Sequence, residues 1–438
     1  MDPQTLLFSI FTPEGRENSF PALEALRETA PVYYDKDLDT YFLTTYAHCQ
    51  AVLTDAAFRT PDLSWCEEHL PDWRDHPAAD FFYASLLRAN SPHHSRLRRL
   101  VNAGFTPRRV AALQSAVEDL TDLHLDAFAD ATADGGAANF QELVGYPLPV
   151  AVVGELIGVP AADRPRFRSL GSDASRLLEP VRGPEDWARA DAAVTELRAY
   201  FEELLQRRGR EPREDLATVL LEAHEGQERL TRRELVDTLL LVFVAGFETT
   251  TAMLGLVTHA LLTHPDQRDL VTGDPGLAAQ AVEEALRWDT PVQMTERIAT
   301  ERTEIGGVTI PVGANVTTVL TAANRDPAQF PDPHRFDVRR SGTKVLSFSA
   351  GPHYCLGAAL ARLEGTVAVL RLFARFPHLA VSGVPVRRES FSLRVYEDLP
   401  LSAHGSLSAH GSLTAYGPMT SLDRATLNTH HSERVTSS

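Results

Sequence analysis

The sequence contains little cysteine: 438 residues include only Cys49, Cys66 and Cys355. None of the three belongs to a CxxC pair, so a zinc site built from thiolates is not expected. An odd and sparse set of cysteines also argues against a disulfide framework and is typical of a reducing compartment. A cysteine that takes part in chemistry here must therefore act alone.

The sequence also has fewer basic than acidic residues, and we expect neither a leader segment nor a membrane-spanning apolar run. Lys and Arg number 42 against 59 Asp and Glu, a net charge of −17, which disfavours nucleic-acid binding. The first 20 residues hold a single basic residue, Arg16, unlike a secretory or mitochondrial signal. The most apolar run, residues 239–247, is shorter than the roughly 20 residues that span a bilayer. We expect a cytoplasmic monomer that binds neither membrane nor nucleic acid.

Helical periodicity dominates what is present. Apolar residues recur at helical spacing over 96–101, 110–127, 184–207 and 213–223, with charge on the opposite face. Strand patterns are shorter: they cover 31–45, a hairpin over 305–319 with Gly306-Gly307 at its turn, and a small sheet over 381–395. This mixture predicts a mainly α fold with minor β.

The last segment differs in composition. The hexapeptide Leu-Ser-Ala-His-Gly-Ser begins at Leu401 and is repeated at once, and polar residues continue to Ser438. Such a repeat has too few apolar residues to form a core. We therefore expect one domain over residues 1–400 and a flexible, low-complexity tail over 401–438.

One cysteine lies in a loop between two glycines. Residues 348–357 read Phe-Ser-Ala-Gly-Pro-His-Tyr-Cys-Leu-Gly, and helical periodicity follows over 358–375. Free amides and the positive dipole end of that helix favour an anion, which predicts a depressed pKa and a thiolate at Cys355. Gly351 and Gly357 let the backbone approach a flat partner, and Phe348 adds an apolar wall. From these residues alone Cys355 is either a nucleophile or a metal ligand, whereas Cys49 and Cys66 are expected in the core.

The pattern Phe-x-x-Gly-x-x-x-Cys-x-Gly resembles the haem-binding loop of the cytochrome P450 family, specifically its soluble bacterial, actinomycete-like class. The resemblance implies that Cys355 is the proximal iron ligand of haem b, iron-protoporphyrin IX. It also implies the single-domain, triangular prism-like P450 fold, with the haem between a long central helix and the cysteine loop. Ser349 departs from the family, which often has glycine there.

A second motif lies within a helix that begins with the capping box Thr231-Arg-Arg-Glu234. The helix contains Ala-Gly-Phe-Glu-Thr-Thr over residues 245–250, and glycine with adjacent threonines can open a helix locally. The alternative is a buried helix with packed threonines. The resemblance implies a groove for O₂ at Ala245 and Gly246. It implies catalytic proton delivery by Thr249 and Glu248.

Two further motifs consist of charged residues. Glu284 and Arg287 at i and i+3 could form an ordinary surface pair, but the resemblance implies a buried structural network with Arg335 beneath the haem. His94 and Arg98 one turn apart could be a solvated basic face. The resemblance instead implies that four residues bind the haem propionates: His94, Arg98, Arg297 and His353.

The implied activity is that of a monooxygenase, which inserts one oxygen atom from O₂ into a hydrophobic small molecule, here a polyketide-like secondary metabolite. No flavin or dinucleotide fingerprint occurs, so electrons from NAD(P)H are expected through a separate ferredoxin and ferredoxin reductase. An acidic ferredoxin requires a basic docking patch near the cysteine. The residues expected in that patch are Arg96, Arg99, Arg108, Arg109, Lys344 and Arg362.

A large apolar and aromatic cavity is expected to hold the substrate. Its expected lining is Trp65, Phe81, Phe82, Tyr83, Phe243, Phe247, Val292, Met294 and Val395. Two other functions stay open: a haem-thiolate enzyme for C–C or C–O coupling or peroxide-driven oxidation, and a non-catalytic haem sensor. Glu248 and Thr249 argue against the peroxide route and the sensor, because neither needs an acid–alcohol pair.

Overall fold

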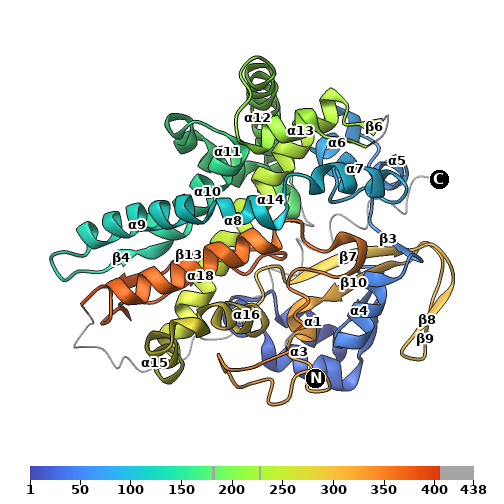
Figure 1. The fold of residues 1–438 in the computed structure, drawn as a ribbon. Helices are drawn as coiled ribbons and strands as arrows, with labels where there is room; N and C mark the ends of the chain where they lie inside the picture. Colours follow the sequence, from blue (N-terminus) through green and yellow to red (C-terminus); the bar gives the residue numbers. More distant parts are fainter. Residues whose placement is uncertain (180–182, 226–227, 343, 405–438) are drawn as a thin grey trace.

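A long helix, α14 (Arg232–Thr263), runs through the middle of the molecule (Figure 1). The structure is a computed structural model that describes residues 1–179, 183–225, 228–342 and 344–404. Thr231 Oγ1 accepts a hydrogen bond from the Glu234 amide at 3.2 Å, and the Glu234 carboxylate accepts one from the Thr231 amide at 2.8 Å. These bonds form the predicted capping box. Although α14 is long and apolar enough to cross a membrane, 72% of its most apolar window is buried inside the protein, as in a core helix.

The other helices surround α14, which packs against α10, α11, α12, α16 and α18. In chain order the remaining helices are α1 (Pro3–Ser9), α2 (Pro13–Glu17), α3 (Phe20–Thr29), α4 (Tyr46–Thr54), α5 (Leu63–His69), α6 (Pro77–Ala84), α7 (His93–Asn102), α8 (Pro107–Ala112), α9 (Gln114–Ala131), α10 (Pro147–Ile157), α11 (Arg164–Ser175), α12 (Pro184–Arg210), α13 (Leu216–Glu222), α15 (Pro265–Gly273), α16 (Ala278–Trp288), α17 (Leu320–Ala323) and α18 (Ala358–Arg375). The predicted mainly α fold is confirmed.

Two predicted helices have different bounds. The segment predicted over 110–127 is divided at Leu113 into α8 and α9. The segment predicted from residue 213 begins only at Leu216, because Asp215 caps it by accepting a hydrogen bond from the Thr218 amide at 2.9 Å. Periodicity locates apolar faces, whereas local caps set where each helix begins and ends.

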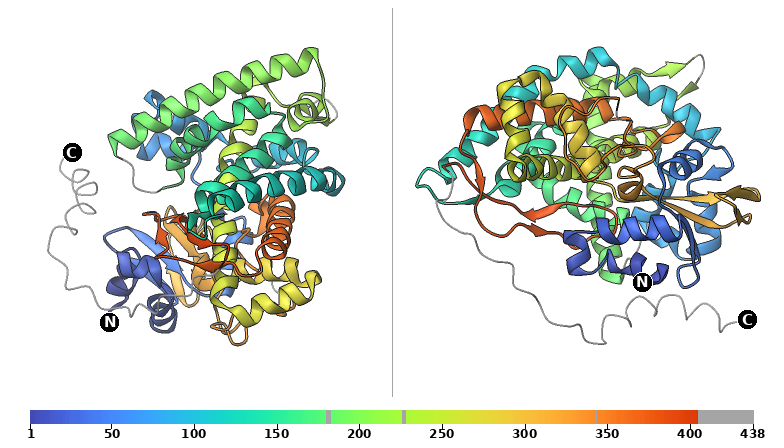
Figure 2. Two further views of the ribbon diagram at one scale, coloured as in Figure 1. Left: turned by 90° about the vertical axis from the view of Figure 1, so that its left-hand side faces the viewer. Right: turned by 90° about the horizontal axis from the view of Figure 1, so that it is seen from below.

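The strands β3, β7 and β10 lie near α1 and α4 (Figures 1 and 2), whereas β4 lies beside α9 and β6 beside α13 (Figure 1). They are β1 (Val32–Asp35), β2 (Thr40–Leu43), β3 (Phe58–Arg59), β4 (Ala138–Asn139), β5 (His224–Glu225), β6 (Glu228–Arg229), β7 (Met294–Ala299), β8 (Thr303–Ile305), β9 (Val308–Ile310), β10 (Asn315–Val319), β11 (Ala380–Val381), β12 (Val386–Arg387), β13 (Tyr396–Asp398) and β14 (Pro400–Ser402). A five-stranded sheet has the order β1-β2-β10-β7-β3.

The predicted hairpin over 305–319 is shorter in the structure. Gly306 and Gly307, both with positive φ, turn the chain between β8 and β9. β10 leaves this hairpin and pairs in parallel with β2 and antiparallel with β7. The burial of Val316 and Val319 explains this arrangement, because both valines join the core.

The domain also extends beyond its predicted end at residue 400. β14 pairs with β11 and β4, and Leu401 is fully buried. The beginning of the first hexapeptide copy is therefore a strand, which corrects the predicted boundary. The predicted tail from residue 405 onward lies outside the described residues.

Candidate active site

One face of α14 is accessible although the helix lies in the core. Val242, Ala245, Gly246 and Thr249 are partly accessible, at the three- and four-residue spacing of one helix face. The Thr249 hydroxyl donates to the Ala245 carbonyl at 2.8 Å. The Thr250 hydroxyl likewise donates to the Gly246 carbonyl, at 2.7 Å. The predicted motif therefore places small residues and one hydroxyl along an open surface.

The cysteine loop turns back on itself before α18. The Cys355 amide donates to the Phe348 carbonyl at 2.9 Å. Gly351 has a φ of +66°, and a Cβ there would lie 2.5 Å from the Leu53 carbonyl oxygen. Ser349 has a φ of 61°, a conformation that glycine adopts more easily, and its buried hydroxyl has no hydrogen-bond partner among the described residues. This positive φ explains why a glycine, as the resemblance led us to expect, would suit position 349.

Cys355 lies in this loop, three residues before α18 begins at Ala358. It is exposed, whereas Cys49 and Cys66 are buried as predicted. A Cβ on Gly357 would meet no heavy atom within 4 Å. Phe348 is buried, so it provides the expected apolar neighbour.

The pKa of Cys355 corrects our prediction of a depressed value. Desolvation by the surrounding protein raises the pKa of the thiol, and the opposing effects of the Gly357 amide, Arg98 and Arg362 do not reverse the shift. The amides at the beginning of α18 therefore favour the thiolate but do not suffice to produce it. A bound cation would supply the missing stabilisation.

Four cationic or donor side chains gather near the cysteine. The His94 and His353 ring centroids lie 4.2 Å apart. Desolvation and then His94 and Arg297 lower the pKa of His353 to about 3, and desolvation and then Arg98 lower that of His94 to about 4. The structure therefore brings the four predicted propionate-binding residues together electrostatically.

These side chains lack an anion. Among the described residues, the buried Arg297 guanidinium donates only to its neighbours, the Thr295 hydroxyl at 3.2 Å and the Glu296 carbonyl at 2.7 Å. Within the part of the chain that the structure describes, no carboxylate forms an ion pair with Arg98 or Arg297. Two propionates would provide the missing negative charge, so this donor set fits a haem.

The number of possible protein ligands near Cys355 also bears on which metal group could bind there. The described residues contain no group of three or more His, Cys, Asp or Glu side chains that could hold a metal ion. An iron porphyrin needs only one protein ligand on this side, because the porphyrin supplies four nitrogen ligands itself, so a lone cysteine fits it.

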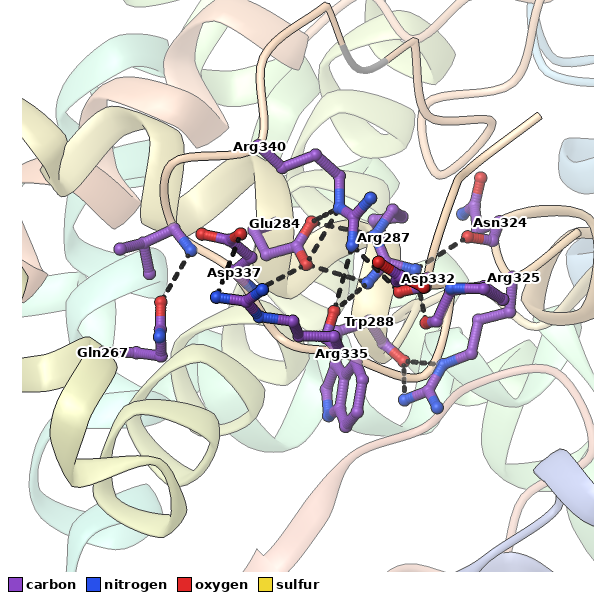
Figure 3. A network of polar contacts seen from close by, with 12 residues as sticks. Gln267, Glu284, Arg287, Trp288, Asn324, Arg325, Asp332, Arg335, Asp337 and Arg340 are labelled. Atoms are coloured by element: carbon purple, nitrogen blue, oxygen red, sulfur yellow. Dashed lines mark hydrogen bonds and ion pairs between the residues drawn. The ribbon is translucent and has the colours of Figure 1, made fainter. Parts of the chain in front are cut away.

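The buried Glu284–Arg287 pair is present as predicted, with two contacts of 2.8 Å (Figure 3). The prediction that Arg335 is the third member of this network is wrong. Its side chain is 65% exposed and lies 3.7 Å from Asp337. Arg340 occupies the expected position instead, with its Nε 3.1 Å from the Glu284 carboxylate.

The bonding around Arg340 explains the correction. Its guanidinium also donates to the carbonyls of Pro331, Asp332 and Arg335, so the loop before it wraps around the side chain. Arg335 contributes only its carbonyl, which accepts from Arg287 at 3.1 Å. The Asp337 amide donates to Glu284 at 2.9 Å, and this contact places Arg340 above the carboxylate.

The acidic residue of the α14 motif is fully buried. The Glu248 carboxylate forms an ion pair with Arg388 at 3.0 Å and accepts from the Ser175 hydroxyl at 3.2 Å. The sequence analysis missed Arg388 and Ser175, because they lie 140 and 73 positions away and no local pattern marks them.

The predicted substrate lining is only partly accessible. Trp65, Val292 and Met294 keep accessible surface. Phe243 and Phe247 stack on each other with centroids 5.3 Å apart, and Phe247 would meet a Cβ on Gly171 at 2.4 Å. They belong to the core rather than to a pocket, as do the buried residues Phe81, Phe82, Tyr83 and Val395. Aromatic content alone did not distinguish these roles.

The predicted basic patch is also smaller than expected. Arg96 pairs with Glu234, Arg99 with Glu228 and Arg362 with Glu283, so these charges are largely balanced. Arg108, Arg109 and Lys344 are exposed. The two arginines lie on α8, which packs against α18, the helix that follows Cys355.

Comparison with known proteins adds independent findings. A family model described as Cytochrome P450 matches residues 173–272 and 276–394. The chain is 39% identical to 6-deoxyerythronolide B hydroxylase of Saccharopolyspora erythraea over 392 residues, 87% of this chain and 95% of the relative. It is 36% identical to cytochrome P450 monooxygenase PikC of Streptomyces venezuelae over 371 residues, 84% and 86% of the two chains. The solved structure of the Bacillus subtilis bacillaene polyketide synthase cytochrome P450 PksS matches with a TM-score of 0.80 and 31% identity, covering 92% of this chain and 99% of that one.

Proposed function

Because this chain belongs to the cytochrome P450 family, we propose that it oxidises a polyketide-like secondary metabolite with O₂. The enzyme is a monooxygenase that inserts one oxygen atom from O₂ into a hydrophobic small molecule. The observation that carries the proposal is the exposed Cys355 sulfur in a loop that opens α18, beside side chains that lack an anion. The named relatives that act on 6-deoxyerythronolide B or belong to bacillaene synthesis support the substrate class.

The cofactor in this proposal is haem b. Cys355 would hold its iron, Phe348 and the glycines Gly351 and Gly357 would border the ring, and Ala245 and Gly246 would face it from α14. The propionates would bind His94, Arg98, Arg297 and His353. When bound, haem supplies the redox chemistry that activates O₂.

The protein's own contribution to the reaction is to move protons and to exclude water. The Thr249 hydroxyl donates a hydrogen bond to the Ala245 carbonyl, so its oxygen is free to accept a hydrogen bond on the accessible face of α14. Glu248 is the nearest acid in sequence and the proposed source of protons. Buried Phe243 and Phe247 keep bulk water from the neighbouring face of the helix.

Electrons in this proposal come from NAD(P)H through a ferredoxin reductase and a ferredoxin in the cytoplasm. The exposed pair Arg108 and Arg109 supports docking of an acidic carrier near α18, because opposite charges raise the rate of encounter. The enzyme acts as a monomer.

Isotope labelling tests the reaction. We would supply the haem-loaded enzyme with NADPH, a surrogate ferredoxin and reductase, ¹⁸O₂ and 6-deoxyerythronolide B as the probe substrate. A product with one labelled oxygen atom supports the proposal. Product that forms from hydrogen peroxide without reductase would favour the peroxide-driven alternative, and no O₂ consumption with any carrier would favour the sensor.

A further inference from the structure

A cavity of about 350 Å³ lies beyond the accessible face of α14, between that helix, α3 and the end of α16. Its α14 residues run from Leu256 to Thr263 and begin about two turns after Thr249, roughly 10 Å further along the helix axis. Its described lining residues all lie outside the cysteine loop. The cavity therefore belongs to a part of the molecule that the proposed reaction does not use, and its size is that of a small-molecule site.

The buried part of the lining carries more positive than negative charge. It contains three guanidinium groups, those of Arg325, Arg387 and Arg394, and one carboxylate, that of Asp289. Asp289 accepts hydrogen bonds from Arg394 and, at 2.9 Å, from Arg387. Desolvation and then Arg387 lower the pKa of His259, another lining residue, to about 4, so it is neutral at pH 7. Three cations against one anion leave an excess of positive charge beside the cavity.

The other two acidic residues of the lining lie at its edge. The side chains of Glu17 and Glu24 are 59% and 38% exposed. Glu24 lies 2.9 Å from His334, and Glu17 Oε2 lies 3.7 Å from Arg387 Nε, which is too long for a hydrogen bond. Because water screens exposed charges, these two carboxylates offset the buried excess only weakly.

Arg387 has donors that no described acceptor uses. Its side chain is only 8% exposed, and its Nη2 donates to Asp289 and, at 3.0 Å, to the Tyr396 hydroxyl. Its Nη1 and Nε are buried and have no hydrogen-bond partner among the described residues. A buried donor without an acceptor costs free energy, and an anion in the cavity would remove that cost.

Aromatic and aliphatic side chains form the rest of the wall. The Arg325 guanidinium lies between two rings, with its central carbon 3.4 Å from the Phe20 centroid and 3.6 Å from the Trp288 centroid. It also donates to the Trp288 carbonyl at 2.9 Å (Figure 3). Leu256 and Ala260 add apolar surface from α14. A ligand that matches this wall has a flat apolar body as well as an anionic group.

We propose that this cavity is a second binding site, which takes a small organic carboxylate with a flat apolar body, and that Arg387 donates to its carboxylate. Hydrogen bonds from a guanidinium to a carboxylate are short and strong. A neutral analogue would leave the same buried donors without an acceptor, so the site should discriminate sharply against it. Glu17 at the edge would compete with the ligand for Arg387.

Calorimetric titration of the haem-loaded protein with sodium 2-naphthoate tests the ligand class. The controls are 2-naphthamide, which has the same rings without the charge, and inorganic phosphate, which has charge without the rings. We expect naphthoate to bind at one site and about tenfold more tightly than either control. Equal affinities for naphthoate and one of the controls would overturn the proposal. A Soret shift that follows the same titration curve would place the probe beside the haem and would also overturn it.

Substitution at the edge of the cavity tests its location. Thr263 is exposed there and donates to the His259 carbonyl at 2.8 Å within its own helix. Thr263→Trp should fill the opening and weaken naphthoate binding at least about tenfold. Thr195 is the matched control, because it is also exposed and donates to the Asp191 carbonyl at 2.7 Å within α12. Thr195→Trp should leave the affinity unchanged, and native affinity in Thr263→Trp would overturn the proposal.

Two charge variants test the role of Arg387. Arg387→Gln should weaken naphthoate binding about tenfold, whereas Arg387→Lys should weaken it less because the charge remains. Glu17→Gln should tighten binding about threefold, since it removes an exposed competitor. Glu17→Gln leaves the buried ion pairs of Asp289 in place, so it remains informative if the Arg387 variants do not fold. Weaker binding in Glu17→Gln, or native affinity in a folded Arg387→Gln, would contradict the assignment.

Discussion

Single residues in this protein owe their behaviour to partners far away in sequence. Desolvation by the surrounding protein raises the pKa of the Cys355 thiol more than the Gly357 amide and Arg98 lower it. The amides that follow Cys355 can be inferred from the sequence, whereas this desolvation depends on the folded chain. The same holds for Glu248, whose motif was evident while its partner Arg388 was not.

Replacement of Thr249 by alanine tests the hydroxyl on the accessible face. The variant keeps the haem spectrum, because Thr249 bonds only to the Ala245 carbonyl in the described structure. Loss of an ordered proton path should raise the hydrogen peroxide formed per NADPH by about tenfold, which is less than the roughly 10²–10⁴-fold that a proton-transfer group typically contributes to a rate. Thr249→Ser should stay within about twofold of the native enzyme, and equal losses in both variants would contradict the role of the hydroxyl.

Asp289 gives a pH-dependent prediction for stability. Burial opposes its charge, yet Arg394 and Arg387 lower the pKa of its carboxyl to about 2. Because this folded-state pKa lies below the unfolded one, the stabilisation is complete above about pH 4 and is lost as the pH falls towards 2. Asp289→Asn should lower the free energy of unfolding at pH 7 by about 3 kcal/mol.

Urea unfolding followed by circular dichroism at pH 7, 4 and 3 measures this effect. The difference in unfolding free energy between native and variant should narrow by roughly 1 kcal/mol across this series. The exposed residue Asp75 provides the control, since Asp75→Asn should stay within about 0.5 kcal/mol of native at every pH. If this difference in unfolding free energy did not change with pH, the charge of the Asp289 carboxylate would not be the cause of the stabilisation.

At the scale of elements, periodicity and caps predicted the long helices α12, α14 and α18, because each of them carries its own apolar face. Loops were harder. Residues 335–340 contain Arg335, Arg339 and Arg340 within six positions, and no spacing rule tells which guanidinium turns inward. Strand pairing such as that of β10 with β2 and β7 also depends on distant segments.

The two arginines of this loop allow a direct comparison. Arg340→Ala removes a cation from a nearly buried carboxylate and should cost about 3 kcal/mol of unfolding free energy. Arg335→Ala leaves its carbonyl in place and should cost less than about 0.5 kcal/mol. Chemical unfolding of the two variants side by side measures the difference. Equal losses of unfolding free energy in the two variants would show that the Arg335 side chain does belong to the network.

At the scale of the whole molecule, the sequence identified the fold through four motifs, and α18, which follows the cysteine loop, packs against α14 and α16, which carry two of the others. It did not identify which apolar residues are accessible to a substrate, since Phe243 and Phe247 are buried whereas Val292 and Met294 keep accessible surface. Amphipathic periodicity separates inside from outside but cannot distinguish a packed core from a lined cavity. The extent of the basic docking patch was likewise overestimated, because ion pairs with distant residues balance three of its six predicted charges.

Charge reversal on α8 tests the docking surface. Arg108→Glu with Arg109→Glu should raise the KM for an acidic ferredoxin by about tenfold at low salt, and the effect should fade near 0.5 M salt, where screening is strong. Lys36→Glu with Arg302→Glu reverses the same number of exposed charges elsewhere and should leave KM within about twofold. An unchanged KM in the α8 variant would place the carrier on another face.

The reduced, carbon monoxide-treated absorption spectrum tests the central claim most directly, because its Soret position reports whether a thiolate is bound to the haem iron. Native protein should show the strongly red-shifted band, and Cys66→Ser, which alters a buried cysteine, should show it too. Cys355→Ser should lose that band while the protein remains folded by circular dichroism. A Cys355→Ser protein with the native spectrum would contradict the assignment of this sulfur as the iron ligand.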